Sequence, residues 1–301
     1  MKYKIGIDGG GTKTEGVLVD EEGNVAAVHV GAGCNPSLVG LETAKSIVTA
    51  TLDSLRAQAG GLAAGGEKPE CVATLLCMAG SASVWGEFAE SLTGYGKVVA
   101  SDDSLPVLEL ATNGRPGLVL HSGTGSFVAA RAPDNSIHYA GGVGWRFGDP
   151  GSGHDIGRRA IGHALLDLQG LAPESPLALE LLKYTGLKDA AAITRYFHHE
   201  SEAPERIAPF ATNVIQLAEQ GDKASLQVIA KSAGELLDLA IRVGTRHFSA
   251  SVLDSLTVGL SGAILTNQLV QDALASRAPF HLVPVVSKPI EGVRRMLAAI
   301  E

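Results

Sequence analysis

The sequence is poor in cysteine, and this scarcity argues against two kinds of small scaffold. Cys34, Cys71 and Cys77 are the only cysteines among 301 residues. No pair of them has the C-x-x-C spacing, with further ligands downstream, that a structural zinc site needs. Three scattered thiols are also too few for a framework of disulfides. A disulfide scaffold and a structural zinc site are therefore disfavoured.

The chain also lacks an excess of positive charge and any long apolar run. Its 24 Lys and Arg residues against 32 Asp and Glu give a formal net charge of -8. This balance disfavours a nucleic-acid partner, because counterion release needs a basic surface. Nowhere do 18 apolar residues follow one another, so no membrane-spanning helix is expected. We predict a cytoplasmic protein that binds neither nucleic acid nor a membrane, and a homodimer is left open.

Glycine is the residue present in excess. It fills 37 of 301 positions, well above the roughly 7% of average usage, and no collagen-like period accompanies it. The 45% of hydrophobic residues and the chain length allow one large core or two ordinary domains. So much glycine indicates tight turns or backbone that passes close to a ligand.

One pattern of strand, glycine turn, strand, turn and strand occurs twice. The first copy spans residues 4–30 and the second spans residues 118–140. A shift of 112 residues places Gly11 and Thr12 on Gly123 and Thr124. The economical interpretation is two related halves. Because strands alternate with helical segments between the copies, the sequence predicts an α/β fold.

The first glycine turn fails two nucleotide-binding fingerprints. The G-x-G-x-x-G frame that begins at Gly9 has Thr14 in place of its last glycine, and a strand follows instead of a helix. A Walker A loop is excluded because Thr12 replaces the glycine before Lys13. What remains is a hairpin turn whose backbone N–H groups and hydroxyls can hold phosphate oxygens. A tight hairpin without a ligand is the alternative.

The second glycine turn, Ser122–Ser126, repeats this design without a charged residue. Two hairpins of glycine and hydroxyl residues fit the two ends of one polyphosphate better than either does alone. The pair therefore favours a phosphate-binding site.

Three segments together resemble a known family. Asp8–Thr14, Ser122–Ser126 and Gly148–Gly153 occur in an order and at spacings that resemble the N-acetylglucosamine and glucosamine kinases, which belong to the BadF/BadG/BcrA/BcrD-type ATPases of the actin and hexokinase superfamily. The resemblance covers nearly the whole chain. It implies an α/β fold of two actin-like (ribonuclease H-like) domains with a nucleotide cleft between them. Residues 1–115 plus 288–301 would form the first domain, and residues 116–287 the second, with helical additions.

The resemblance implies ATP and Mg²⁺ as cofactors, with Asp8 near the metal ion through water. The positions assigned to the nucleotide lie in the two hairpins and in a third turn that resembles an adenosine-binding one: Asp8, Gly10, Gly11, Thr12, Lys13, Thr14, Gly123, Thr124, Gly125, Ser126, Gly259, Ser261 and Gly262.

Asp102 is the predicted catalytic residue. It ends a predicted strand before a helix, and a gap-free count matches it, rather than Asp103, to the family's catalytic aspartate. A sugar hydroxyl is a poor nucleophile, so a carboxylate must orient it and take its proton. The alternative role for Asp102 is a helix cap, for which Asp103 is the better candidate.

The resemblance also implies a sugar substrate and a pocket for it. The positions assigned to the sugar are Asn35, Asp102, Gly141, Gly142 and Asp149. Amides and carboxylates suit this role because each can engage neighbouring hydroxyl groups. Asn35 could instead be an ordinary turn residue beside Pro36.

Two positions depart from the family pattern. Val143 follows the paired glycines where animal-type N-acetylglucosamine kinases carry Trp, and Pro150 replaces an acid that is common after Asp149. Both changes fall around the 2-position of the sugar. The choice between acetylated and free glucosamine therefore stays open.

The predicted function is ATP-dependent phosphorylation of an amino sugar at its 6-hydroxyl. One alternative is an ATPase that activates a 2-hydroxyacyl-CoA dehydratase or benzoyl-CoA reductase, but the three cysteines are poorly spaced for the iron–sulfur cluster it needs. The other alternative is a non-catalytic sugar-sensing protein, against which the presence of Asp102 argues.

Overall fold

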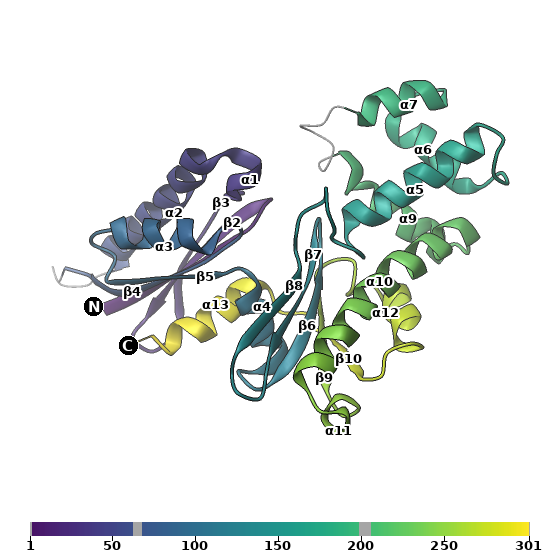
Figure 1. The fold of residues 1–301 in the computed structure, drawn as a ribbon. Helices are drawn as coiled ribbons and strands as arrows, with labels where there is room; N and C mark the ends of the chain where they lie inside the picture. Colours follow the sequence, from purple (N-terminus) through teal and green to yellow (C-terminus); the bar gives the residue numbers. More distant parts are fainter. Residues whose placement is uncertain (1, 63–67, 199–205, 301) are drawn as a thin grey trace. The chain divides into compact units, whose positions relative to one another are not determined.

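The chain divides into two compact units in the computed structural model, which describes residues 2–62, 68–198 and 206–300 (Figure 1). Unit 1 comprises Met1–Gly114 and Ser287–Glu301, and unit 2 comprises Arg115–Val286. Each unit contains a mixed five-stranded sheet covered by helices. The predicted α/β class is thereby confirmed.

The sheet of unit 1 begins with an antiparallel meander and continues with parallel strands. Its strands are β1 (Lys2–Gly9), β2 (Lys13–Asp20), β3 (Val25–Ala32), β4 (Glu70–Met78) and β5 (Lys97–Asp102). Their order is β3-β2-β1-β4-β5, in which β1 pairs antiparallel with β2 and parallel with β4. The β-branched Ile5 and Ile7 are fully buried on β1, as a central strand requires.

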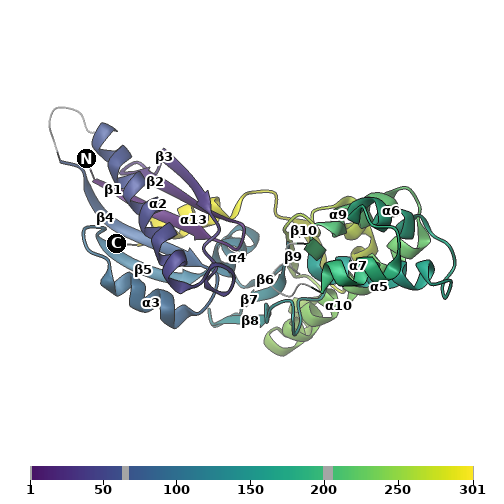
Figure 2. The same ribbon diagram turned by 90° about the horizontal axis from the view of Figure 1, so that it is seen from above.

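Helices cover both faces of this sheet (Figure 2). They are α1 (Pro36–Val39), α2 (Leu41–Leu62), α3 (Ala82–Ser91), α4 (Ser104–Thr112) and α13 (Pro289–Ala298). Leu52 of α2 and Trp85 of α3 belong to the apolar cluster on one face. Val293 and Leu297 of α13 form the smaller cluster on the other face, where α13 also packs against α4. The last helix of the chain thus belongs to unit 1.

Unit 2 repeats the strand plan of unit 1. Its strands are β6 (Gly117–Ser122), β7 (Ser126–Arg131), β8 (Ile137–Gly141), β9 (Thr257–Ser261) and β10 (His281–Pro284). Their order is β10-β9-β6-β7-β8, so β6 stands where β1 stands in unit 1, and β7 where β2 stands. The two glycine turns join equivalent strands. The prediction of two related halves is confirmed by this topology.

The helices of unit 2 form the larger apolar core. They are α5 (Gly153–Leu168), α6 (Pro176–Thr185), α7 (Ala190–Phe197), α9 (Phe210–Glu219), α10 (Lys223–His247), α11 (Ala250–Leu253) and α12 (Gln268–Ala275). Helix α10 packs on β6 and β7, where Leu236 and Leu237 meet Leu120 and Val128 in one cluster. The short elements α1, α11 and β10 were not predicted, because four residues are too few to show a periodic pattern.

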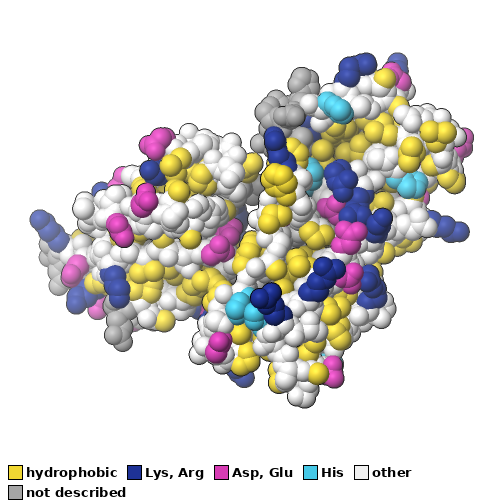
Figure 3. Space-filling model, in the orientation of Figure 1, with side chains coloured by type: hydrophobic (Ala, Val, Ile, Leu, Met, Phe, Trp, Pro, Cys, Tyr) yellow, Lys and Arg dark blue, Asp and Glu magenta, His cyan; other side chains and the backbone are white. Residues whose placement is uncertain are grey.

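The surface carries charges of both signs. On the face shown in Figure 3, acidic and basic side chains are interspersed over both units. Within the described ranges, no helix combines the length and the apolar character needed to cross a membrane. Cys34, Cys71 and Cys77 are all free thiols.

Candidate functional site

The turn between β1 and β2 is held firmly at its base and is open at its tip. The Gly10 N–H donates to Lys13 O at 3.0 Å, and the Cys34 N–H donates to Gly10 O at 3.0 Å. Gly11, Thr12 and Lys13 are exposed. The second hydrogen bond also brings the segment that contains Asn35 beside the turn. Unit 1 therefore presents an exposed glycine turn next to an amide side chain.

Two side chains of this hairpin have partners within the sheet. The Lys13 ammonium forms an ion pair with the buried Glu15 carboxylate. Thr14 is fully buried, and its hydroxyl donates to Ala32 O of β3 at 2.7 Å. Because that bond uses the hydroxyl proton, Thr14 ties β2 to β3 and has no proton left to donate to a phosphate.

Acidic side chains gather at the carboxyl ends of β1 and β5. Asp8 pairs with Cys77 of β4, and the next β4 residue, Met78, pairs with Asp102 of β5. Since β1, β4 and β5 are parallel, their carboxyl ends lie at one edge, where open α/β sheets bind ligands. Burial raises the pKa of Asp8 to about 6, against the lowering effect of the Lys13 ammonium.

Asp102, rather than Asp103, makes the capping hydrogen bond at the start of α4. The Ser104 N–H donates to Asp102 Oδ1 at 2.9 Å, whereas Asp103 makes no capping hydrogen bond with its side chain. The expectation that Asp103 caps the helix is therefore wrong. Its backbone is already helical, with φ −67° and ψ −14°, whereas a capping side chain usually starts from extended backbone.

Asp103 has a different distinguishing property. Burial, together with the neighbouring carboxylates of Asp102 and Asp8, raises the pKa of Asp103 to about 7. This acid thus faces the other two without capping the helix. The raised pKa of Asp103 could not be predicted from the sequence, because the gap-free count and the capping rule use only positions along the chain. The pKa depends also on Asp8, which lies on another strand of the sheet.

The position of Asn35 is compatible with both interpretations of the sequence, a sugar-binding residue and a turn residue beside Pro36. It caps the short helix α1, and its Oδ1 accepts a hydrogen bond from the Ser37 N–H at 3.0 Å. The cap fixes the orientation of the half-buried amide, and its oxygen is already used as the acceptor for the Ser37 N–H. A ligand hydroxyl would therefore meet the Nδ2 group.

The hairpin turn of unit 2 is bound to the segment that follows β8. The buried Ser122 hydroxyl donates to Gly151 O and the buried Ser126 hydroxyl donates to Pro150 O, both at 2.6 Å. Ser126, like Thr14, therefore spends its hydroxyl proton on a backbone carbonyl. The turn also accepts from the segment, since the Gly153 N–H donates to Gly123 O at 2.8 Å.

Asp149 lies against this hairpin turn. It is 5% exposed and has a left-handed φ of 62°, and burial raises the pKa of its carboxyl. Its Oδ1 accepts from the Gly144 N–H at 3.3 Å. A Cβ added to Gly125 would lie 2.9 Å from Asp149 Oδ2. The structure thus brings together Gly125 and Asp149, which the sequence assigned to nucleotide and sugar respectively.

The other predicted turns of unit 2 meet at the same hairpin. Gly262 has φ 87°, and a Cβ there would lie 2.1 Å from Ser122 O. The Gly142 N–H donates to Ser126 O at 3.0 Å, next to Gly141 at the end of β8. All the segments that the sequence assigned to a site in unit 2 therefore contact the 122–126 hairpin.

Three polar residues near these turns were not predicted: the half-buried His121 and the buried Ser232 and Asp155. His121 precedes the hairpin, stacks on Phe127 and lies 3.2 Å from the Ser261 hydroxyl through Nδ1. Burial lowers the pKa of His121 to about 4. Ser232 accepts a hydrogen bond from the Gly151 N–H and donates one to Asp155. No local motif marks these residues, because they reach the turns from other parts of the chain.

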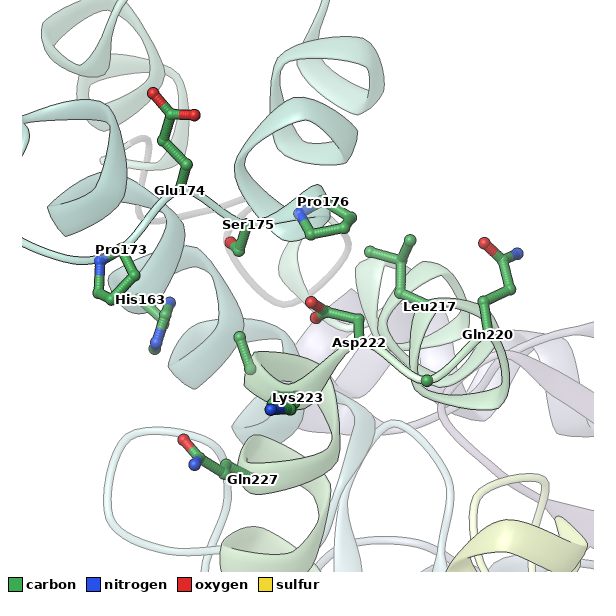
Figure 4. A pocket seen from close by; sticks show the side chains of 12 residues that line it. His163, Pro173, Glu174, Ser175, Pro176, Leu217, Gln220, Asp222, Lys223 and Gln227 are labelled. Atoms are coloured by element: carbon green, nitrogen blue, oxygen red, sulfur yellow. The ribbon is translucent and has the colours of Figure 1, made fainter.

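A separate cavity lies among the helices of unit 2 (Figure 4). It encloses about 620 Å³ and is lined by His163 of α5, by the connection that leads into α6 and by the start of α10 with Lys223. Its described lining includes none of the residues that the sequence assigned to a site. This cavity and the glycine turns are therefore different features of unit 2.

The comparison with known families decides the affiliation of the chain. Residues 5–281 match the BadF/BadG/BcrA/BcrD ATPase family. The chain belongs to this ATPase family. The resemblance noted from the motifs is thereby confirmed, and the match includes both glycine hairpins, Asp102 and Asp149.

Curated relatives within this range carry sugar kinase names. The chain is 29% identical over 241 residues to an N-acetylmuramic acid/N-acetylglucosamine kinase from Clostridium acetobutylicum, which covers 78% of this chain and 77% of the relative. It is 24% identical over 293 residues to the glucosamine kinase GspK of Vibrio cholerae, which covers 97% and 94%.

Solved structures agree with the architecture. A crystal structure from Chromobacterium violaceum, provisionally designated an N-acetylglucosamine kinase, has a TM-score of 0.75 at 25% identity and covers 99% of both chains. A ROK family glucokinase from Streptomyces griseus has a TM-score of 0.58 at 14% identity over 98% of both chains, which shows likeness of fold alone. The predicted two-domain, actin-like fold class is confirmed by these neighbours.

Proposed function

We propose that this protein is an ATP-dependent kinase that phosphorylates N-acetylglucosamine or glucosamine at the 6-hydroxyl. The proposal rests chiefly on one observation. Two glycine hairpins occupy the same place in two sheets of the same strand order, and each has an acid beside it, Asp8 in unit 1 and Asp149 in unit 2. The names of the relatives support an amino sugar as the phosphoryl acceptor.

The glycine turns suit a phosphate group. A Cβ added to Gly10 would have only Lys13 O within 4 Å, at 3.5 Å, and one added to Gly123 only His121 Nε2, at 3.6 Å. Packing therefore leaves space at Gly10 and at Gly123, which a phosphate can fill while backbone N–H groups bind it. In this proposal Thr12, Lys13 and Thr124 hold the phosphates, whereas Thr14 and Ser126 shape the turns.

Asp8 is the residue that suits Mg²⁺. Carboxylate oxygens are ligands that Mg²⁺ favours, and it commonly keeps several of its waters. Within the described part of the chain, no group of three His, Cys, Asp or Glu side chains is arranged to hold a metal ion. A single carboxylate acting through water, together with phosphate oxygens, fits that arrangement. Mg²⁺ bound there would offset the negative charge of the transferring phosphate.

Asp102 is the proposed general base. Its Oδ1 accepts the Ser104 N–H, which fixes the carboxylate at the end of β5. In this proposal the carboxylate accepts the proton of the 6-hydroxyl. Asn35 would donate to a sugar hydroxyl through Nδ2, and Asp149 would accept from another. The glycines Gly141 and Gly142 would pass close to the sugar or its 2-substituent.

A coupled ADP-release assay tests this function. ATP turnover is measured with N-acetylglucosamine, glucosamine, glucose and N-acetylmannosamine, and the product is examined for phosphate on O6. We expect turnover to require an amino sugar, because binding of the correct sugar assembles the catalytic groups. Rapid hydrolysis without sugar, or an iron–sulfur absorption band after anaerobic purification, would support the activator alternative. Sugar binding without turnover would support the sensor.

A further inference from the structure

The segment Asp149–Gly153 has a backbone conformation that is unfavourable without support from neighbouring residues. Asp149 is left-handed and precedes a proline, and the residue before a proline normally adopts an extended conformation. Gly151 is left-handed too, with φ 78°. Left-handed backbone at a residue other than glycine costs free energy and persists only where its surroundings enforce it. The contacts of the next two residues show what enforces it here.

Three consecutive polar groups of this backbone each bond to a buried serine hydroxyl. Pro150 O accepts from Ser126 and Gly151 O from Ser122, as described above. The Gly151 N–H donates to Ser232 Oγ at 3.1 Å. The three serines come from β7, β6 and α10, and each is at most 2% exposed. The segment is therefore fastened from the sheet and from a helix at once.

The serine on α10 has its own fixed orientation. Its hydroxyl proton goes to Asp155 Oδ2 at 2.6 Å, so a lone pair of the oxygen faces the Gly151 N–H. Asp155 in turn pairs with Arg159, which also pairs with Glu235 on α10. Ser232 thus links the 149–153 segment to a charged network between α5 and α10.

We propose that Ser126 and Ser232 are positioning residues for the Asp149 carboxylate and thereby set the affinity for the sugar. Asp149 Oδ2 lies against Gly125, so a small movement of the segment would move this carboxylate relative to the phosphate hairpin. Neither hydroxyl needs to touch the substrate for this effect. The inference rests on the proposed function, in which Asp149 binds the sugar.

The test compares the kinetics of Ser232→Ala with those of the wild-type protein. The lost acceptor leaves the buried Gly151 N–H unpaired, which frees the segment. We expect the KM for the amino sugar to rise about tenfold, while the KM for ATP stays within about twofold, since a buried unpaired donor costs on the order of one factor of ten in binding. Ser126→Ala should also raise the KM for the sugar about tenfold and serves if Ser232→Ala fails to fold. Its KM for ATP is left out of the test, because Ser126 also shapes the phosphate turn.

Ser225→Ala is the matched control. Ser225 lies on the same helix, is fully buried, and has a hydroxyl oxygen without a hydrogen-bond partner. Its removal should leave both KM values unchanged. A double-mutant cycle then separates positioning from general damage: in an Asp149→Asn background, Ser232→Ala should have little further effect on the sugar KM, because it acts through Asp149.

The outcomes separate the inference from the function. An active wild-type enzyme whose sugar KM is unchanged in both serine variants overturns the inference alone. Equal rises in both KM values of Ser232→Ala, or additive effects in the cycle, overturn it as well. A wild-type protein that phosphorylates no amino sugar overturns the proposed function, and the inference falls with it.

Discussion

The two glycine hairpins have the same place in their sheets and different chemical surroundings. The turn of unit 1 is exposed and lies beside charged groups, with the Lys13–Glu15 ion pair on one side and carboxyls of raised pKa at the strand ends. The turn of unit 2 has serine hydroxyls bonded to a neighbouring backbone segment. A duplicated strand plan therefore fixes where a ligand can bind, and the side chains decide what each copy contributes.

This difference divides the proposed chemistry. In unit 1 the groups that can exchange a proton or meet a cation, Asp8 and Asp102, stand at the carboxyl ends of parallel strands. In unit 2 the polar groups mostly hold one another, and the result is a rigid frame around Asp149. We infer that substitutions in unit 1 change turnover most, whereas those in unit 2 change stability and sugar affinity.

The largest effect is expected from Asp102→Asn. The substitution keeps the size of the side chain and an oxygen that can cap Ser104, but it removes the basic oxygen. Turnover should fall by about 10²- to 10⁴-fold, the usual contribution of a general base, while the sugar still binds. Initial rates and sugar binding by calorimetry measure the two quantities separately.

Asp103→Asn is the control for this experiment. It removes the neighbouring acid without removing the capping bond, so turnover at neutral pH should stay within about tenfold of the wild type. If Asp103→Asn is the inactive variant and Asp102→Asn is not, the base has been assigned to the wrong acid. If both are fully active, neither acid is the base.

The next effect in size tests the packing of unit 2. Gly262 and Gly144 have nearly the same left-handed φ, 87° and 86°. A Cβ at Gly262 would lie 2.1 Å from Ser122 O, whereas a Cβ at Gly144 would meet nothing within 4 Å. Gly144→Ala should therefore cost only the backbone strain, about 1 kcal/mol of unfolding free energy. Gly262→Ala should cost about 3 kcal/mol or more, because backbone must move as well.

Denaturant unfolding of both alanine variants measures the difference. Equal losses would mean that the 259–262 turn can shift away from the 122–126 hairpin at little cost. That result would contradict the description of unit 2 as a rigid frame.

The features of this comparison that could be predicted from the sequence are those that local sequence patterns determine. The hairpins, their repeat and the long helices follow from glycine spacing and apolar periodicity. The capping bond of Asp102 in place of Asp103 could not be predicted, because it depends on the backbone angles at the end of β5. Nor could the contacts of Ser232, which lies 81 residues from its partner Gly151.

A smaller effect concerns the amide in unit 1. Asn35→Ala removes both the α1 cap and the proposed donor to the sugar, whereas Asn35→Asp keeps an oxygen that can accept the Ser37 N–H. Both variants should raise the KM for the sugar about tenfold, but only the alanine variant should lose stability, by about 1 kcal/mol. An unchanged sugar KM in Asn35→Asp would show that the amide group serves the helix alone.

The last effect is a pH dependence of stability with opposite sign in the two units. The pKa of Asp103 in unit 1 is raised to about 7 by burial and by the carboxylates of Asp102 and Asp8. A raised pKa means that the folded state holds the proton more tightly, so this contribution to stability is present below about pH 4 and is lost as the pH rises through 7. His121 in unit 2 behaves in the opposite way: because its pKa is lowered to about 4 by burial, its contribution is lost as the pH falls from about 6.5 through 4.

Thermal melts of Asp103→Asn and His121→Asn between pH 4 and 8 isolate these two contributions. Asparagine at position 103 stays neutral, as the protonated acid is, so the variant should match the wild type near pH 4 and melt a few degrees above it at pH 8. Asparagine at position 121 cannot take up a proton, so any destabilisation that it causes at pH 8 should shrink as the pH falls to 4. A difference from the wild type that does not change with pH, in either variant, would mean that the group concerned has an ordinary pKa in the folded protein. The contrast between the surroundings of the two hairpins would then not extend to that residue.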